Sequence, residues 1–137
     1  CFDKNDDYPP ILKFEKMKKS FFFDKSINLL PIKVKHGSIN SLCFIINNKL
    51  AYLPDANGIY KKDFSKFKNL QYMIVDCLRY TRHPSHFNFE DIIKLNFFLK
   101  PKKMILTNLH SDLDYNELLD ILPKNIKPAY DGLSINI

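Results

Sequence analysis

The sequence predicts an α/β layered fold in which antiparallel hairpins come first and alternating strands and helices follow. Two observations support this. Between residues 20 and 53, short runs rich in Phe, Ile, Leu and Val are separated by short polar turns, which is typical of hairpins. From residue 71 onward, strand-like apolar runs alternate with helical patterns. The chain has 137 residues, 45% of them hydrophobic, so we expect it to form one domain or a large part of one.

The first half contains the hairpins. Residues 1–19 are expected to be an irregular entry segment, because Pro9 and Pro10 resist both helix and central strand. Asn47 and Asn48 are expected to form a tight turn, since asparagine accepts positive φ. The expected strands are 20–24, 27–36, 42–47 and 49–53.

The second half alternates. Residues 72–78 form a nearly continuous apolar run, which indicates a strand buried on both faces. Asn88 can cap a helix that begins at Phe89, and Pro101 ends it. The remaining expected elements are a strand at 103–107, a helix at 114–122, a turn at 131–132 and a final strand at 133–137.

Charge and cysteine content exclude some classes of protein. The net charge is +6, but the lysines are scattered among acidic residues and only Arg79 and Arg82 are arginines, so we expect no nucleic-acid module. A basic surface still suits a small anionic substrate. Cys43 and Cys77 are expected to be buried hydrophobic residues rather than ligands, which fits a reducing cytoplasm. No apolar run has the length of a membrane span, and no signal peptide opens the chain.

Four polar residues are candidates for a metal site. His36, His86 and His110 lie at polar breaks after strand-like runs, and Asp55 leaves a strand and is preceded by Pro54. Imidazole and carboxylate groups suit zinc, manganese or iron, and a bridging carboxylate can hold two such ions that activate water. This set has the kind of side chains that a metal-dependent hydrolase needs.

Other interpretations of the same residues remain open. A histidine in a polar loop is more often solvated than metal-bound. Asp55 and Asp131 are also typical turn residues, and Asp112 and Asp114 are typical helix caps. His83 could serve only to order the loop around Pro84.

A series of motifs resembles a known family. In order, they are Tyr-Pro-Pro-Ile-Leu at 8–12, His-Gly at 36–37, Ala-Tyr-Leu-Pro-Asp at 51–55, Asp-Cys-Leu-Arg at 76–79, His-Pro-Ser-His-Phe at 83–87, Leu-Thr-Asn-Leu-His-Ser-Asp-Leu-Asp-Tyr at 106–115 and Pro-Ala-Tyr-Asp-Gly at 128–132. They resemble the metallo-β-lactamase-fold hydrolases, in the branch that includes the phosphoribosyl cyclic phosphodiesterase. The resemblance spans residues 1–137 but only the later half of the family's domain. It implies a layered β-sandwich with outer helices.

The resemblance also implies roles for individual residues. His36 matches a metal-ligand histidine, and Asp55 matches the bridging aspartate. His86 matches the histidine that acts as general acid or base, a role suited to a pKa near neutrality. His83 would lie behind these residues rather than contact the metal.

Two departures from the family pattern stand out. The place of the family's last ligand histidine is taken by Asn108, so either Asn108 or His110 would meet the second ion. We expect His110, oriented by Asp112, because imidazole is much the better ligand for these metals. The motif His-x-His-x-Asp-His, which supplies about half of the ligands, is absent from the sequence.

These observations lead to one main expectation and one alternative. Because the resemblance covers only the later half of the family's domain, and the chain opens on Cys1 without a methionine, we expect it to be the C-terminal portion of a single hydrolase domain. The complete protein would use two divalent ions, zinc or manganese or iron, to cleave a phosphodiester, including cyclic ones, and would pair as a homodimer. The isolated chain would be inactive. The alternative is a non-catalytic remnant or half-domain that binds a protein partner.

Overall fold

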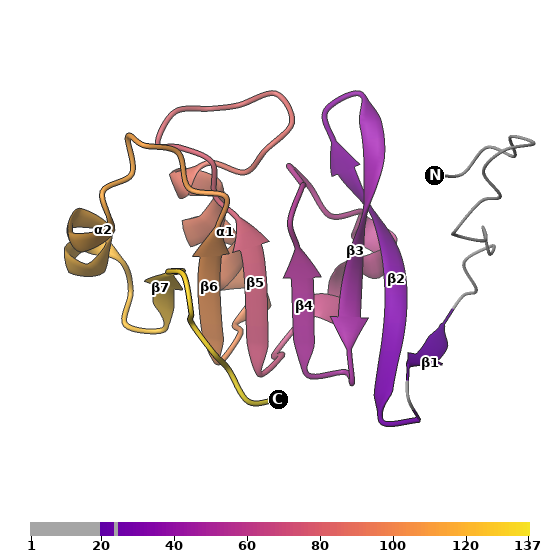
Figure 1. Ribbon diagram of the computed structural model, residues 1–137. Coiled ribbons are helices and arrows are strands. Elements are labelled where there is room, and N and C mark those ends of the chain that lie inside the picture. The colour runs from indigo at the N-terminus through magenta and orange to yellow at the C-terminus, as the bar shows by residue number, and fades with distance from the viewer. Residues whose placement is uncertain (1–19, 24) are drawn as a thin grey trace, which may run out of the picture.

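The computed structural model describes residues 20–23 and 25–137, which form one sheet with helices against it (Figure 1). Seven strands lie in the same order in the sheet as in the sequence. The first four strands pair antiparallel and the last four pair parallel. The strands are β1 (Phe21–Phe23), β2 (Ile27–His36), β3 (Ile39–Ile46), β4 (Leu50–Leu53), β5 (Tyr72–Asp76), β6 (Lys103–Thr107) and β7 (Ile126–Pro128); the helices are η1 (Lys61–Phe67), α1 (Phe89–Leu99) and α2 (Tyr115–Ile121).

The hairpin half follows the sequence prediction closely. The β3–β4 turn places Asn47 and Asn48 at φ 51° and 54°, the left-handed conformation that asparagine tolerates. The side-chain oxygen of Asn47 also accepts a hydrogen bond from the backbone N–H of Asn28, 2.8 Å away, and so ties this turn to β2. The expected strand at 20–24 is confirmed as β1 over Phe21–Phe23, while its last residue lies outside the described residues, as do the Pro9 and Pro10 of the entry segment.

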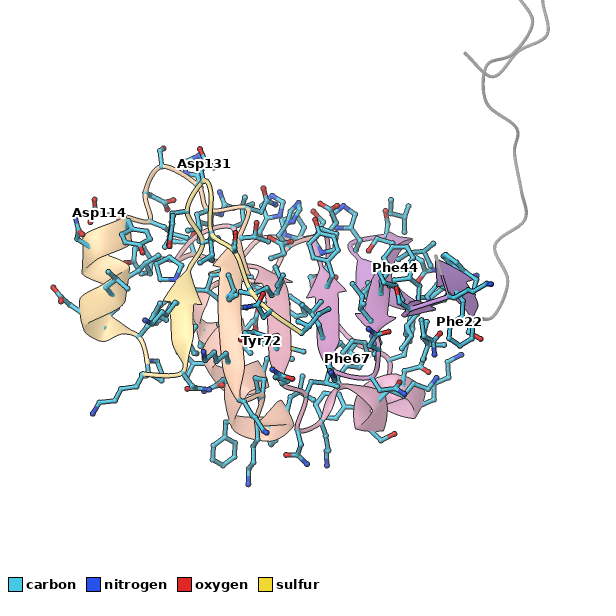
Figure 2. All side chains as sticks on the ribbon, turned by 60° about the horizontal axis from the view of Figure 1, so that its bottom comes forward. Phe22, Phe44, Phe67, Tyr72, Asp114 and Asp131 are labelled. Carbon is cyan, nitrogen blue, oxygen red and sulfur yellow. The ribbon has the colours of Figure 1, made fainter. Side chains whose placement is uncertain are left out.

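The main core lies between one face of the sheet and the helices η1 and α1. Val34, Met73 and Leu106 from the strands are fully buried against Phe67 of η1 and Ile92 of α1. Figure 1 shows both helices behind the sheet, and Figure 2 shows Phe67 on η1. Burial of large apolar side chains such as these contributes about 1.5 to 3 kcal/mol each, which makes this face the main source of stability.

Helix α1 begins and ends where the sequence indicates. Asn88 accepts a hydrogen bond from the backbone N–H of Asp91, and the Asp91 carboxylate accepts one from the backbone of Asn88, which is a complete capping box. The helix ends at Leu99, Lys100 turns into the left-handed region at φ 50°, and Pro101 follows. Asp114 caps α2, because its carboxylate accepts hydrogen bonds from the backbone N–H groups of Asn116 and Glu117.

The opposite face of the sheet is also apolar but is covered differently. Register places Phe44, Tyr52, Ile74 and Ile105 side by side across β3, β4, β5 and β6 on this face. The C-terminal segment runs over the β5–β6 side of it, near Tyr72 (Figure 2), and packs Leu133 and Ile135 against it. No described helix contributes to this apolar cluster. Tyr52 remains 39% exposed and Leu42 38% exposed.

The last strand was predicted at the wrong place. Residues 133–137 form no strand, and the edge strand is β7 at Ile126–Pro128 instead. Its alternating pattern is too short to recognise, and Pro128 argues against a strand except at a sheet edge, where β7 lies. Helix η1 was not predicted either, because its lysine-rich sequence buries only Asp63 and Phe67.

Among residues 20–23 and 25–137, no helix is long and apolar enough to cross a membrane.

Candidate active site

Several polar residues meet at one edge of the sheet. Strands β2, β4, β5 and β6 run in the same direction and end at this edge, which is the upper one in Figure 1. His36 is the last residue of β2, Asp55 follows β4, Asp76 ends β5 and Asn108 follows β6. His86 lies on the loop between β5 and α1. The topology thus brings together residues that are up to 72 positions apart in the sequence, from His36 to Asn108.

His36, Asp55 and His86 form a group that fits a metal ion. Each offers one ligand atom, and these atoms lie within 4.8 Å of one another. The ring centroids of His36 and His86 are 4.8 Å apart, and the two rings are nearly perpendicular. Two imidazoles and a carboxylate are a donor set that zinc, manganese and iron all accept.

The hydrogen bond of His36 selects the nitrogen that is free to bind. Its Nδ1 donates to the backbone carbonyl of Ser85 at 2.8 Å, so Nε2 carries the lone pair. Ligand histidines in metal sites usually donate their other nitrogen in this way. The arrangement around His36 therefore fits a metal ligand.

Asp76 is fully buried and organises His86. One carboxylate oxygen accepts from Nδ1 of His86 and from the backbone N–H of Ala56 at 3.3 Å, and the other accepts from the side-chain amide of Asn108 at 3.3 Å. Burial raises the pKa of Asp76, against the opposing effect of these hydrogen bonds. Because Asp76 engages Nδ1, Nε2 of His86 is the nitrogen left for chemistry.

Two residues hold the loops of the site together. The side-chain oxygen of Asn57 accepts from the backbone N–H of Gly37 at 3.2 Å, and its amide donates to the carbonyl of Pro84 at 2.6 Å. Gly37 has φ +63°, and a Cβ there would lie 3.2 Å from Cβ of Ser85. Glycine thus permits both the turn after His36 and the close approach of the histidine-bearing loop.

The structure brings some of the predicted site residues together and separates others. His36, Asp55 and His86 share one group, and the ring of His83 lies 5.0 Å from that of His86. His110 is not in that group: it is 60% exposed and pairs with Asp112 at 2.8 Å. The pairing matches the expected orienting role of Asp112, while metal binding by His110 stays a prediction.

Sequence reasoning missed the two residues that position the others. The signal for Asp76 was a carboxylate that ends an otherwise apolar strand, where an unpaired charge would be costly. Asn57 gave no comparable signal, because Asp-Ala-Asn-Gly at 55–58 reads as an ordinary turn.

The comparisons with solved structures identify the fold. A diphosphatase of the PhnP family superposes with a TM-score of 0.81 at 25% identity, covering 86% of this chain and 46% of the diphosphatase. The metallo-β-lactamase-fold protein YhfI from Bacillus subtilis superposes with a TM-score of 0.69 at 15% identity, covering 89% of this chain and 54% of YhfI. This chain has the metallo-β-lactamase fold. The resemblance inferred from its motifs is therefore confirmed.

One curated relative of this metallo-β-lactamase-fold chain is named as a transferase rather than as a hydrolase. An octanoyltransferase of Porphyromonas gingivalis is 30% identical over 96% of the chain, which spans only 27% of that protein. No family model matches the sequence. The chain thus spans about a quarter of this curated relative and about half of the structures that it matches.

Proposed function

We propose that this chain is the C-terminal portion of a metal-dependent hydrolase domain that cleaves phosphodiesters, including cyclic ones. The observation that carries the proposal is the convergence of His36, Asp55 and His86 from three separate segments of the chain at one sheet edge. The fold shared with a diphosphatase supports a phosphorus-centred reaction.

In this proposal His36 and Asp55 hold metal ions, and the missing ligands come from residues outside this chain. When bound, zinc, manganese or iron would supply positive charge for the phosphoryl oxygens and lower the pKa of water. His110 is proposed as a further ligand, for which it would have to leave its position beside Asp112.

His86 is proposed to transfer the proton. Nδ1 of His86 is hydrogen-bonded to buried Asp76, which holds the imidazole ring in place. A proton on Nε2 can therefore pass to the leaving oxygen without a change in the orientation of the ring. His36 stands beside it, with rings 4.8 Å apart, so the proton donor and the metal ligand would face the same phosphate.

The second apolar face of the sheet supports the idea of a partial domain. Tyr52 and Leu42 are more than a third exposed there, next to Phe44 and Ile46, which are partly buried. An apolar sheet face of this kind is normally covered by a second layer. We propose that the other sheet of the same hydrolase domain covers it.

The same face favours a second candidate function. A non-catalytic half-domain would use it to bind a separate protein, and the replacement of a ligand histidine by Asn108 suits such a role. The two functions differ in metal dependence. A chain that binds a protein partner through this face but no divalent ion would favour the second.

The test is hydrolysis of bis(p-nitrophenyl) phosphate by the complete protein with Mn²⁺ or Zn²⁺. We expect His86→Ala to lower kcat by about 10² to 10⁴-fold without changing the metal content, and Asp55→Asn to lower both. An enzyme that turns over equally well without metal would contradict the proposal.

We also propose that the complete protein is a homodimer in the cytoplasm. Gel filtration of that protein tests the homodimer, and cell fractionation tests the cytoplasmic location.

A further inference from the structure

The edge of the sheet opposite the candidate active site carries a row of lysines. Strands β4, β5, β6 and β7 begin at this edge, which is the lower one in Figure 1. No acidic residue occurs in the connections that lead into them, which are residues 47–49, 68–71, 100–102 and 122–125. The same connections contain five exposed lysines, here called the lysine edge: Lys49, Lys68, Lys100, Lys102 and Lys124. None of the five forms an ion pair with any residue in the described part of the chain, 20–23 and 25–137.

Hydrogen bonds hold three of these four connections in fixed positions relative to one another. The backbone N–H of Lys102 donates to the carbonyl of Leu70 at 2.9 Å, which joins 100–102 to 68–71. The side-chain amide of Asn125 donates to the carbonyl of Pro101 at 3.2 Å and to the side-chain oxygen of Asn96, on α1, at 2.8 Å. The lysines of these connections therefore stand on one rigid surface that also includes the end of α1.

Two exposed phenylalanines lie at the same surface. Phe97 and Phe98 are in the last turn of α1, directly before Lys100, and are 70% and 58% exposed. Their ring centroids are 5.3 Å apart and the rings are nearly perpendicular. Phenylalanine gains free energy when it is buried, so an adjacent exposed pair beside a row of lysines indicates a surface that binds something both apolar and anionic.

The helices that border the lysine edge contribute little opposing charge. Asp63 of η1 already pairs with Lys66 at 2.7 Å. The acidic residues of α1, Glu90 and Asp91, are in its first turn, at the end of the helix away from the lysines. Asp120, in the last turn of α2, is exposed and is one carboxylate against five lysines. Positive charge therefore dominates this edge, and an anionic surface is attracted to it.

We propose that the lysine edge, together with Phe97 and Phe98, binds the surface of an anionic membrane. The two rings would enter the boundary between headgroups and acyl chains, while the lysines contact the anionic headgroups around them. The charged groups here are all lysines, which act as flexible point charges and suit mobile headgroups, whereas fixed recognition of phosphates in RNA or in a phosphopeptide favours arginine. The protein would lie on the membrane, with the candidate active site at the edge turned away from it.

Sedimentation with lipid vesicles tests this proposal without any need for metal or hydrolysis. The complete protein is used, because the second apolar face of the isolated chain would itself adsorb to lipid. The vesicles contain phosphatidylcholine alone, or phosphatidylcholine mixed with an equal amount of phosphatidylserine. The apolar test variant combines Phe97→Ser with Phe98→Ser, and its control is Ile39→Ser, since Ile39 is 63% exposed at the opposite edge.

The charge test variant combines Lys102→Gln with Lys124→Gln. Its matched control combines Lys33→Gln with Lys35→Gln, which removes the same charge from exposed positions on β2. All four exchanges replace exposed lysines, so the variants are expected to fold, and circular dichroism checks this.

We expect binding to the vesicles with phosphatidylserine only, and weaker binding as NaCl is added. The phenylalanine variant should bind about tenfold more weakly, and the lysine variant about fivefold more weakly for each lysine removed, with the controls unchanged. Equal binding to both kinds of vesicle, or equal effects of test and control variants, would overturn the proposal. So would binding of polyglutamate or of poly(U) RNA through the same lysines without any binding to vesicles, because the partner would then be an acidic protein or a nucleic acid.

Discussion

Asp76→Asn is the substitution that probes the site most directly. The Asp76 carboxylate is fully buried and accepts from three donors: Nδ1 of His86, the backbone N–H of Ala56 and the amide of Asn108. An asparagine keeps one acceptor oxygen but turns an N–H₂ group toward at least one of these donors. The change therefore leaves a buried donor unpaired or forces His86 into its other tautomer.

The expected loss of stability follows from the number of buried hydrogen-bond donors that the substitution leaves unpaired. One unsatisfied buried polar group costs about 1 to 3 kcal/mol. For a chain of this size, that loss lowers Tm by roughly 3 to 15 °C. The matched control is Asp112→Asn, which removes the partner of His110 at an exposed position and should leave Tm almost unchanged.

The pH dependence adds a second signature. Because burial raises the pKa of Asp76, the folded chain holds this proton more tightly than the unfolded chain. The contribution of Asp76 to the free energy of unfolding is then complete below the ordinary carboxyl pKa and is lost as pH rises through the raised value. The Asn variant has no such group, so the difference in Tm between the two proteins should narrow as pH rises.

Thermal unfolding followed by circular dichroism measures Tm at each pH, and ¹⁵N NMR reports which nitrogen of His86 is protonated. Equal Tm values for Asp76→Asn and Asp112→Asn, together with an unchanged tautomer of His86, would refute the role assigned to Asp76.

Three further predictions concern other parts of the chain. Asn108→Gly keeps the left-handed backbone at φ 58° but removes the amide that donates to Asp76. We expect the free energy of unfolding to fall by about 1 kcal/mol and the His86 resonance to shift in NMR spectra. An unshifted resonance would contradict this. Asn88→Ala removes the capping box of α1 and should lower the free energy of unfolding by about 1 kcal/mol in urea titrations, whereas an unchanged midpoint would show that the cap is dispensable. Burial raises the pKa of the Cys43 and Cys77 thiols to about 12. Both thiols should therefore resist iodoacetamide at pH 8 in the folded chain and react with it in urea, and rapid labelling of the folded chain would contradict this.

The sequence predicts the parts of this structure that depend on local patterns. The hairpins around Asn47, the cap at Asn88 and the strand at 103–107 are all confirmed, because each depends on residues close together in the chain. The convergence of His36, Asp55 and His86 was accessible from motif order, since His36 ends β2, Asp55 follows β4 and His86 lies on the loop after β5.

The remainder depends on pairing between distant segments. Which strand follows β6 at the sheet edge is decided by Ile126 pairing with Met104, and no local signal distinguishes 126–128 from the more strand-like 133–137. The place of His110 depends on where the chain turns after β6, and there it faces Asp112 rather than the group around His36. The role of Asp76 appears only when His86, Ala56 and Asn108 meet around it.

The central claim is that His36 and Asp55 hold a metal ion beside the proton donor His86, and titration of this chain with Zn²⁺ and Mn²⁺ by calorimetry tests it most directly. We expect one ion per chain, with binding strongly weakened by His36→Ala and by Asp55→Asn. His110→Asn serves as the comparison, because His110 lies outside the group and its loss should not weaken this first ion. Binding that survives Asp55→Asn but is lost in His110→Asn would contradict the site, as would the absence of any binding.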